Sequence, residues 1–323
     1  MSRSTILIVS DIHYAGAAEQ TRRDFEWRSI ARPWLRLLAK QYYRHIWMRD
    51  PFAHNGQLDR FLSHPESPDC VIANGDFSCD SAFVGVSDDA AFASAQECLV
   101  KLRDKFGAHF HATIGDHELG KVWLFGERGG MRLASWARAV DGLGLNPFWR
   151  VTRGNCVLLG VTSSLIALPV YQRDTLPDER AGWEKLRTVH LAEIHQAFAD
   201  LKPEQRVLLF CHDPTALPFL WEDELIRSRL PQVEQTTIGH LHTNLVFWKS
   251  RRLAGMPSVS FLGNGIHRMT TALHHARHWR PFNVRLCPSL AGIELSKDGG
   301  YYSAKIDWEA RQPAQFQFHP LLR

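Results

Sequence analysis

Five short groups of acidic and histidine residues recur along the chain, each directly after a stretch of apolar residues. The groups are "SDIH" at 10–13, "NGD" at 74–76, "GDHE" at 115–118, "CHD" at 211–213 and "GHLH" at 239–242. Carboxylates and imidazoles buried together are costly unless a cation compensates their charge and uses their lone pairs. Mixed Asp and His ligands suit Mn, Fe or Zn. The carboxylates and histidines of these groups are numerous enough to hold two ions that share a bridging ligand. The residues therefore predict a dinuclear metal centre.

We expect buried strands just before these groups, because the apolar stretches there are short, aliphatic or β-branched, and bounded by polar or Gly residues. Before the groups, strands are expected at 5–10, 69–75, 108–115, 206–212 and 235–240, and a further one is expected at 155–164, which precedes none of the groups. Helical periodicity at 88–105 and 183–201 alternates with them, which indicates an α/β fold. In open α/β sheets the carboxyl ends of the strands meet at one crevice, where ligands bind. The acidic and histidine residues would lie there.

A lone group of this kind is a weak signal, since a single histidine is more often a core or surface residue than a ligand. The whole series is specific, and it resembles the pattern of the calcineurin-like metallophosphoesterases over residues 11–242. The resemblance implies a four-layer αββα sandwich, in which two mixed sheets are flanked by helices around a dinuclear centre. It assigns Asp11, His13 and His242 to the first metal and Asp116, His212 and His240 to the second, with Asp76 as the bridge between them.

The remaining residues of "GDHE" suggest further roles in catalysis. His117 follows a metal ligand and suits the stabilisation of the transition state and the protonation of the leaving oxygen, since an imidazole has an ordinary pKa near 6.5. Glu118 is expected to orient a neighbouring group, although an exposed salt bridge is nearly as plausible for it. Gly115 is expected to let the backbone turn.

Two positions depart from the family pattern. Asp116 stands where the family usually has Asn, which adds a negative charge that should tighten metal binding but weaken Lewis acidity. Many members carry an Asp three residues after the bridging Asp, where it orients the catalytic histidine. Here that position is Cys79 and the acid is Asp80, so Asp80 is a candidate for the same task. Arg128 and Asn264 are further candidates near the substrate, Asn264 within an expected tight turn at 263–265.

Length and composition indicate a single catalytic domain over 1–323 that carries an insertion at 20–56, with 45% hydrophobic residues. Residues 245–323 should form a strand-rich part of this domain, with strands at 245–249, 258–263, 291–295 and 301–307. The six cysteines lack CxxC spacing and are expected to be reduced. The apolar stretch at 5–10 is too short for a signal peptide, so we expect a cytoplasmic location.

The insertion contains a basic, aromatic stretch at 22–48. Pro33 suits the first turn of a helix. One face of this helix would carry Trp34, Leu37, Leu38, Tyr42 and Trp47, and another would carry Arg28, Arg32, Arg36, Lys40 and Arg44. The simpler interpretation, which the sequence favours, is that the aromatic face packs on the core and the basic row is solvated. The alternative is a helix that contacts the inner face of a membrane or an acyl chain.

These observations favour a metal-dependent phosphohydrolase that cleaves a phosphoester or pyrophosphate bond by direct attack of metal-bound hydroxide. The insertion favours an amphipathic or lipid-linked substrate, such as the nucleotide-sugar lipid precursor that some bacterial members of the family hydrolyse. A cyclic nucleotide or another small phosphodiester is the alternative within the enzyme class. A non-catalytic scaffold that binds partner proteins is the alternative from another class, and the complete ligand set counts against it. The formal net charge of +4 is too small to suggest nucleic acid.

Overall fold

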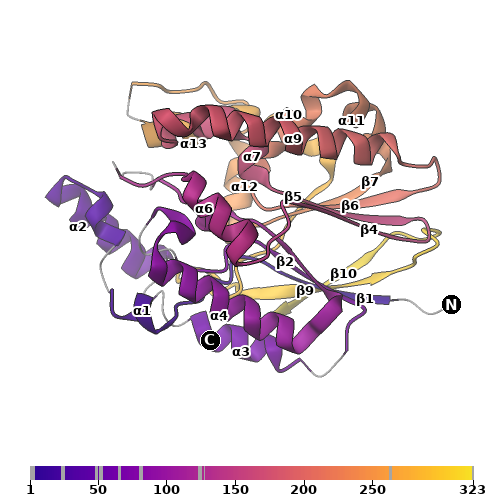
Figure 1. Cartoon of the computed structure of the whole chain (residues 1–323), viewed down its shortest axis with the longest axis horizontal. Helices are drawn as coiled ribbons and strands as arrows, with labels where there is room; N and C mark the ends of the chain where they lie inside the picture. Colours follow the sequence, from indigo (N-terminus) through magenta and orange to yellow (C-terminus); the bar gives the residue numbers. More distant parts are fainter. Residues whose placement is uncertain are drawn as a thin grey trace.

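Two five-stranded mixed sheets form the centre of the molecule (Figure 1). The computed structural model describes residues 4–22, 26–47, 50, 54–64, 67–79, 83–122, 126, 128–261 and 264–321. The first sheet has the order β10-β9-β1-β2-β3 and the second has the order β4-β5-β6-β7-β8. The expected sandwich of two mixed sheets flanked by helices is confirmed.

The first sheet combines parallel and antiparallel pairs. Its strands are β1 (Ser4–Val9), β2 (Cys70–Asn74), β3 (Phe110–Thr113), β9 (Gly300–Ile306) and β10 (Gln315–Pro320). β1, β2 and β3 run parallel, whereas β9 is antiparallel to β1 and to β10. The carboxyl ends of β1, β2 and β3 therefore lie at the same edge of the sheet, directly before Asp11, Asp76 and Asp116 in the chain.

The second sheet is built the same way. Its strands are β4 (Phe148–Arg153), β5 (Cys156–Val161), β6 (Arg206–Cys211), β7 (Val233–Ile238) and β8 (Val284–Leu286). β5 to β8 run parallel and β4 is antiparallel to β5. The carboxyl ends of β6 and β7 precede His212 and His240.

Helices cover the outer face of each sheet, and Figure 1 shows the two helical layers on opposite sides of the strands. The two longest helices are α4 (Asp89–Phe106) and α9 (Arg180–Ala199). The others are α1 (Ala17–Gln20), α2 (Pro33–Tyr42), α3 (Asn55–Leu62), α5 (Asp116–Leu119), α6 (Leu133–Ala137), α7 (Ser163–Ile166), α8 (Leu168–Tyr171), α10 (Leu217–Glu222), α11 (Glu224–Arg229), α12 (Asn244–Arg252) and α13 (Asn264–His275).

Three hydrophobic clusters hold these layers together. Alternate residues of β1 point to opposite faces, as a strand requires. Leu7 and Val9 pack with α3 and α4, while Ile6 and Ile8 pack between the two sheets with Leu208 and Phe210 among others. A third cluster joins the outer face of the second sheet to α9, α10 and α11. Of the strands that precede the acidic and histidine groups, β1, β2 and β6 are thus buried on both faces over most of their length.

The C-terminal part differs from the expectation in three places. Residues 245–249 lie in α12 and not in a strand; Thr243 accepts from the Leu245 N–H at its N-terminus and its last turn is basic, both of which favour a helix. The described residues of 258–263, as well as 291–295, contain no strand, and Asn264 begins α13 instead of lying in a turn. Only 301–307 matches, in β9. Short apolar runs cannot be assigned to strand or helix by periodicity alone.

All six cysteines are described, and none of them forms a disulfide, which agrees with the expectation of reduced thiols. In the part of the chain that the structure describes, no helix is both long enough and apolar enough to cross a membrane.

Candidate metal centre

The acidic and histidine residues from the five strand ends gather in two groups. The first group holds Asp11, His13, Asp76 and His242, and the second holds Asp116, His212 and His240. Within each group one ligand atom of every residue lies within 4.8 Å of the others. The structure therefore brings together all seven residues that the sequence nominated as metal ligands.

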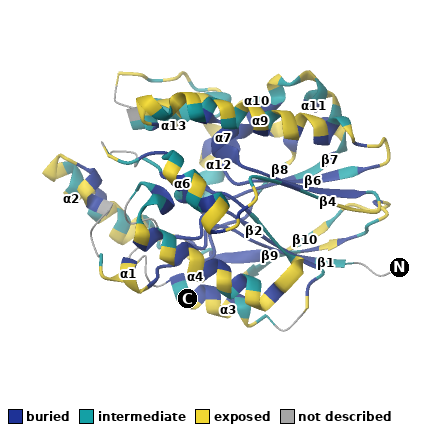
Figure 2. Cartoon of the chain, viewed as in Figure 1, coloured by how far each residue is buried: buried dark blue, intermediate teal, exposed yellow. Residues whose placement is uncertain are grey.

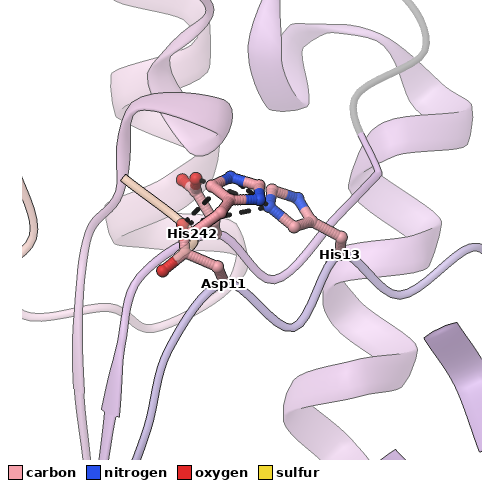
Figure 3. A group of neighbouring side chains, drawn as sticks. Asp11, His13 and His242 are labelled. Carbon is pink, nitrogen blue, oxygen red and sulfur yellow. Dashed lines mark hydrogen bonds and ion pairs between the residues drawn. The ribbon is translucent and has the colours of Figure 1, made fainter. Parts of the chain in front are cut away.

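In the first group, two imidazole nitrogens face one another beside a carboxylate (Figure 3). The Nε2 atoms of His13 and His242 are 3.3 Å apart, and Oδ1 of Asp11 is 3.3 Å from Nε2 of His242. Burial lowers the pKa of both histidines well below the ordinary value, so both rings are neutral at pH 7. Nδ1 of His13 faces the carbonyl of Ser78 at 3.3 Å, which favours a proton on Nδ1 and a lone pair on Nε2. Neutral nitrogens that converge on a carboxylate fit a divalent cation.

The second group is held by shorter contacts between histidines and carboxylates. Oδ1 of Asp116 lies 3.1 Å from Nε2 of His212 and 2.9 Å from Nδ1 of His240. Burial would lower the pKa of each histidine, but the neighbouring carboxylates outweigh it and raise the pKa of both. Nδ1 of His212 lies 2.6 Å from the carbonyl of Asn74, which fixes the ring. These donors also suit a borderline cation such as Mn, Fe or Zn.

Asp76 lies between the two groups. Its Oδ2 is 4.0 Å from Nε2 of His13 and 3.1 Å from Nε2 of His212. Burial and the charge of Asp116 would raise the pKa of Asp76, yet the imidazoles of His212 and His117 hold it below the usual range. A carboxylate that reaches both groups is in the position of a bridging ligand.

The backbone at these residues is strained. Nine non-glycine residues of the described chain have positive φ, and five of them are candidate ligands: Asp11 (51°), His13 (50°), Asp76 (60°), His240 (62°) and His242 (58°). Each such residue costs about 1–3 kcal/mol and persists only where its surroundings fix it. Here the N–H groups of Ile12 and His13 both donate to the carbonyl of Asp76, and that of His240 donates to Asp11 Oδ1 at 3.0 Å. The loops thus lock one another in the conformation that turns the ligands inward.

Two glycines make room for this arrangement. A Cβ on Gly75 would lie 2.7 Å from Nδ1 of His212, and the φ of Gly75 is +84°. A Cβ on Gly115 would lie 2.5 Å from the backbone nitrogen of Asp76, although the φ of Gly115 is an ordinary −88°. The expectation that Gly115 is needed for a turn is therefore wrong, because its role is to let Asp76 approach.

The side chain of Glu118 links the loop that follows β2 to the loop that follows β3. Its carboxylate accepts from the backbone N–H groups of Gly115 (2.9 Å), Asp76 (3.0 Å) and Phe77 (2.8 Å). The side chain is fully buried, so the alternative of an exposed salt bridge is wrong. Burial and the charge of Asp76 raise the pKa of Glu118 to about 7, against the effect of the three N–H donors. This carboxylate fixes the backbone of Asp76.

His117 lies on the same side of Asp76 as the first group. Its backbone N–H donates to Asp76 Oδ1 at 3.0 Å, and its ring centroid is 4.6 Å from that of His13. Burial and the charge of Lys121 lower the pKa of His117 to about 4, so the ring is neutral at pH 7. A neutral imidazole retains one N–H that can donate to an oxygen.

Four residues of the site were missed or given no part in it by the sequence reasoning. Ser10 donates to Asp11 Oδ2 at 2.5 Å and to the carbonyl of Asn74 at 3.0 Å. Lys121 pairs with Asp116 Oδ2 at 3.2 Å, and the ring of Trp47 lies 4.9 Å from that of His242. The signal for Ser10 and Asn74 is a polar residue that ends a buried strand directly before a ligand group.

Three nominated residues remain, namely Arg128, Asp80 and Asn264. Arg128 is exposed. Asp80 and the side chain of Asn264 lie outside the described residues. None of the three is placed in the centre.

Comparisons with known proteins identify the chain's relatives. The family model described as calcineurin-like phosphoesterase matches residues 4–244. Among solved structures, a dimetal phosphatase from Danio rerio is similar at 13% identity and a TM-score of 0.43, with 98% of this chain and 95% of that chain covered. A phosphopantetheinyl hydrolase from Mycobacterium tuberculosis is similar at 16% identity and a TM-score of 0.36, with 74% and 83% covered. Curated proteins give no match.

Proposed function

The chain belongs to the calcineurin-like phosphoesterase family, and from that premise we propose that it hydrolyses a phosphoester or pyrophosphate bond of an amphipathic substrate at a dinuclear centre. The family supports a metal-dependent phosphoesterase, and the two Asp and His groups suit a pair of ions. The proposal adds the number of ions, the roles of individual residues and the class of substrate.

One observation carries the proposal of two ions. Asp76 is the only one of the seven residues whose carboxylate comes within 4.0 Å of a histidine ring nitrogen in both groups, His13 in one and His212 in the other. Two ions bridged in this way lie about 3.5–4 Å apart in known centres. When bound, they would activate a water molecule as nucleophile and neutralise charge on the phosphoryl oxygens.

His117 is assigned to the leaving-group side of the reaction. Its backbone is fixed by the bond to Asp76, and its ring lies beside that of His13, at the edge of the first group. From this position the neutral imidazole would donate a hydrogen bond to a phosphoryl oxygen, whereas its protonated form would donate a proton to the leaving oxygen. Glu118 would hold Asp76 in place through the three backbone N–H groups described above.

Lys121 is assigned to the charge balance of the second group. Asp116 adds an anion where the family usually has an amide, and the Lys121 ammonium lies 3.2 Å from it. The pair restores the charge that an amide would give. We therefore expect Asp116 to bind metal through Oδ1, the atom that faces His212 and His240, while Lys121 holds Oδ2.

An apolar wall beside the first group supports an amphipathic substrate. Trp47 packs its ring against His242, and Tyr42 stacks on Trp47 with centroids 6.3 Å apart. Aromatic side chains next to a polar centre can contact the apolar part of a molecule whose phosphate sits at the metals.

A substrate panel with added Mn tests the proposal. It compares an aryl phosphodiester, an aryl phosphomonoester, a cyclic nucleotide, a nucleoside diphosphate and a lipid pyrophosphate in detergent micelles. We expect metal-dependent hydrolysis, with the highest kcat/KM for the lipid pyrophosphate. Equal or higher kcat/KM for the cyclic nucleotide would replace the amphipathic substrate by a small phosphodiester.

The panel also addresses the non-catalytic alternative. A protein that binds two ions but hydrolyses no substrate of the panel would contradict the enzymatic proposal and favour a scaffold. A matched variant, His242→Ala, removes a ligand of the first group and should abolish hydrolysis of every substrate alike. Residual hydrolysis at the wild-type rate would point to a contaminating enzyme.

A further inference from the structure

Helix α2 exposes a row of large apolar side chains. Trp34, Leu37 and Leu38 are 58%, 61% and 59% exposed, and Tyr42 and Ile46 follow at 44% and 36%. Residues 34, 38 and 42 are four apart, so they form one stripe along the helix. Figure 2 shows α2 at the edge of the molecule with exposed residues along it. The favoured expectation that this aromatic face packs on the core is wrong.

The opposite side of α2 accounts for its packing. Leu35, Ala39 and Tyr43 contact Trp27 and Ile30, in a small cluster that is separate from the three large ones. Tyr43 also meets the ring of Trp27 at 4.9 Å. The helix is therefore attached to the rest of the protein through the opposite side, not through the exposed stripe. The stripe leaves apolar surface in contact with water, and covering that surface would be favourable.

The charge of the same segment narrows what could cover the stripe. Residues 28–48 contain no acidic residue and five Arg or Lys residues, namely Arg28, Arg32, Arg36, Lys40 and Arg44. The positive charge of this segment alone is larger than the formal net charge of the whole chain, which is +4. Arg32 and Arg44 are exposed, at the two ends of α2. A second copy of the chain would bring two such basic segments together, whereas an anionic surface complements them.

The exposed stripe continues to the metal centre. After α2 the chain forms a π-helical turn, Tyr43–Trp47, whose last residue packs on His242. The carbonyls of Ile46 and Trp47 accept from the N–H groups of Leu295 (3.1 Å) and Glu294 (3.0 Å). Leu295 is itself 57% exposed and extends the apolar surface beside Ile46. A surface that covers α2 would therefore also border the first group of ligands.

We propose that α2 is a membrane-docking helix, which lies in the interface of an anionic lipid bilayer with Trp34, Leu37, Leu38, Tyr42 and Ile46 in the apolar layer. Arg32 and Arg44 contact the lipid phosphates at the two ends of the helix. Interfacial helices combine these features, namely aromatic and aliphatic residues on one face and basic residues beside it. The docking would present amphiphiles of the bilayer to the metal centre. It deepens the proposed function, but it is measured without hydrolysis, so either can fail alone.

Co-sedimentation with vesicles tests the docking. Wild-type protein is mixed with vesicles of phosphatidylcholine alone, or of phosphatidylcholine and phosphatidylglycerol in equal parts. We expect binding to the anionic vesicles that falls as salt is raised, and weak binding to the neutral ones. The Trp34→Ser/Leu38→Ser/Tyr42→Ser variant should lose affinity for anionic vesicles by about tenfold or more. Trp47 is left intact because it contacts His242.

Two further variants control this comparison. The Val100→Ser/Val189→Ser variant removes apolar side chains of similar exposure (47% and 54%) from α4 and α9, and it should bind as wild type does. The Arg32→Glu/Arg44→Glu variant alters only exposed charges, so it decides the question even if the triple variant does not fold. It should also lose anionic-vesicle binding.

Three outcomes would overturn the proposal. One is wild-type protein that does not bind anionic vesicles. Another is undiminished binding by the folded triple variant or by the charge-reversal variant. The third is light scattering that shows a wild-type dimer which the triple variant dissociates, because a second copy of the chain would then cover the stripe.

Discussion

The strand-end loops and helix α2 depart from ordinary protein structure in opposite ways. The loops bury carboxylates such as Asp11, Asp76 and Glu118 completely, while α2 leaves Trp34 and Leu38 more than half exposed. Buried charge and exposed apolar surface are both unfavourable in an isolated chain. In the two proposals made above, each region is adapted to something outside the chain, a pair of cations in one case and an apolar phase in the other.

The two regions also differ in how firmly the chain holds them. The loops are cross-linked by hydrogen bonds between distant segments, such as those from His240 to Asp11 and from Phe77 to Glu118. Among the described residues, the packed side of α2 is formed by Leu35, Ala39 and Tyr43, opposite the exposed Trp34 and Leu38. Substitutions in the loops should therefore change the chemistry of the site strongly, whereas substitutions in the stripe should change neither the fold nor the metals.

The largest effect among these predictions concerns His117. His117→Asn should keep both metals and lower kcat by about 10²–10⁴-fold, because it removes the group that assists the leaving oxygen. The loss should shrink for a nitrophenyl leaving group, which needs little protonation. Steady-state kinetics over a series of leaving groups measures this. Equal losses across the series, with metal content intact, would make His117 a phosphate-binding residue and not an acid.

Glu118 tests whether the loops act through their backbone. Glu118→Gln keeps the size of the side chain but turns an amide toward three N–H donors, so the backbone of Asp76 should shift. We expect metal affinity to fall by about 10–100-fold, as when other groups that orient ligands are altered. Titration with Mn, followed by calorimetry, measures the change.

Glu179 offers the matched control for Glu118. Its carboxylate also accepts from a backbone N–H, that of Leu133 at 2.9 Å, but it is not part of the centre. Glu179→Gln should therefore leave metal affinity unchanged. If both variants lose affinity alike, the effect is a general loss of stability and the positioning role of Glu118 is refuted.

Asp116 should give a smaller effect when it is replaced by its isostere. Asp116→Asn keeps an oxygen that can coordinate a metal, so both ions and activity within about tenfold of wild type should remain. Asp116→Ala should lose the ion of the second group. Metal analysis of the two variants side by side separates coordination from charge. Retention of both ions in the alanine variant would remove Asp116 from the ligand set.

The smallest effect should come from the α2 stripe. Trp34→Ser and Leu38→Ser should each change the free energy of unfolding by no more than about 0.5 kcal/mol, since the native state leaves these side chains in water. Ile30→Ala, in the cluster beneath the helix, should cost about 2–5 kcal/mol, because Ile30 is fully buried. Urea unfolding measures all three. A large cost for the stripe would mean that it is packed in solution.

The sequence predicts the metal centre well for a physical reason. Residues such as Asp11 and His240 each follow a strand, and parallel strands bring their carboxyl ends together whatever the details of packing. The same logic predicted β1, β2, β3, β6 and β7, whereas β5 was predicted from its apolar run alone. The sequence did not indicate β4, β8 and β10, which lie at sheet edges and carry no group of ligand residues.

Other features depend on tertiary contacts that periodicity does not contain. The residues of α12 read as a strand because a short apolar run fits either element, and its cap at Thr243 decides the outcome. For α2 the sequence predicted one aromatic face and one basic face and favoured packing of the aromatic face on the core. The packing shows instead that Leu35 and Ala39 contact Trp27 and Ile30, while Trp34 is exposed. The pairing of Lys121 with Asp116 likewise depends on how the chain turns after α5.

The most direct test of the account is the number and position of the metals. Anomalous diffraction from crystals grown with Mn should show two peaks about 3.5–4 Å apart, one on each side of Asp76. Elemental analysis of active protein should agree with two ions per chain, and a chelator should abolish hydrolysis. A single peak, peaks that Asp76 does not bridge, or full activity in metal-free protein would contradict the dinuclear centre.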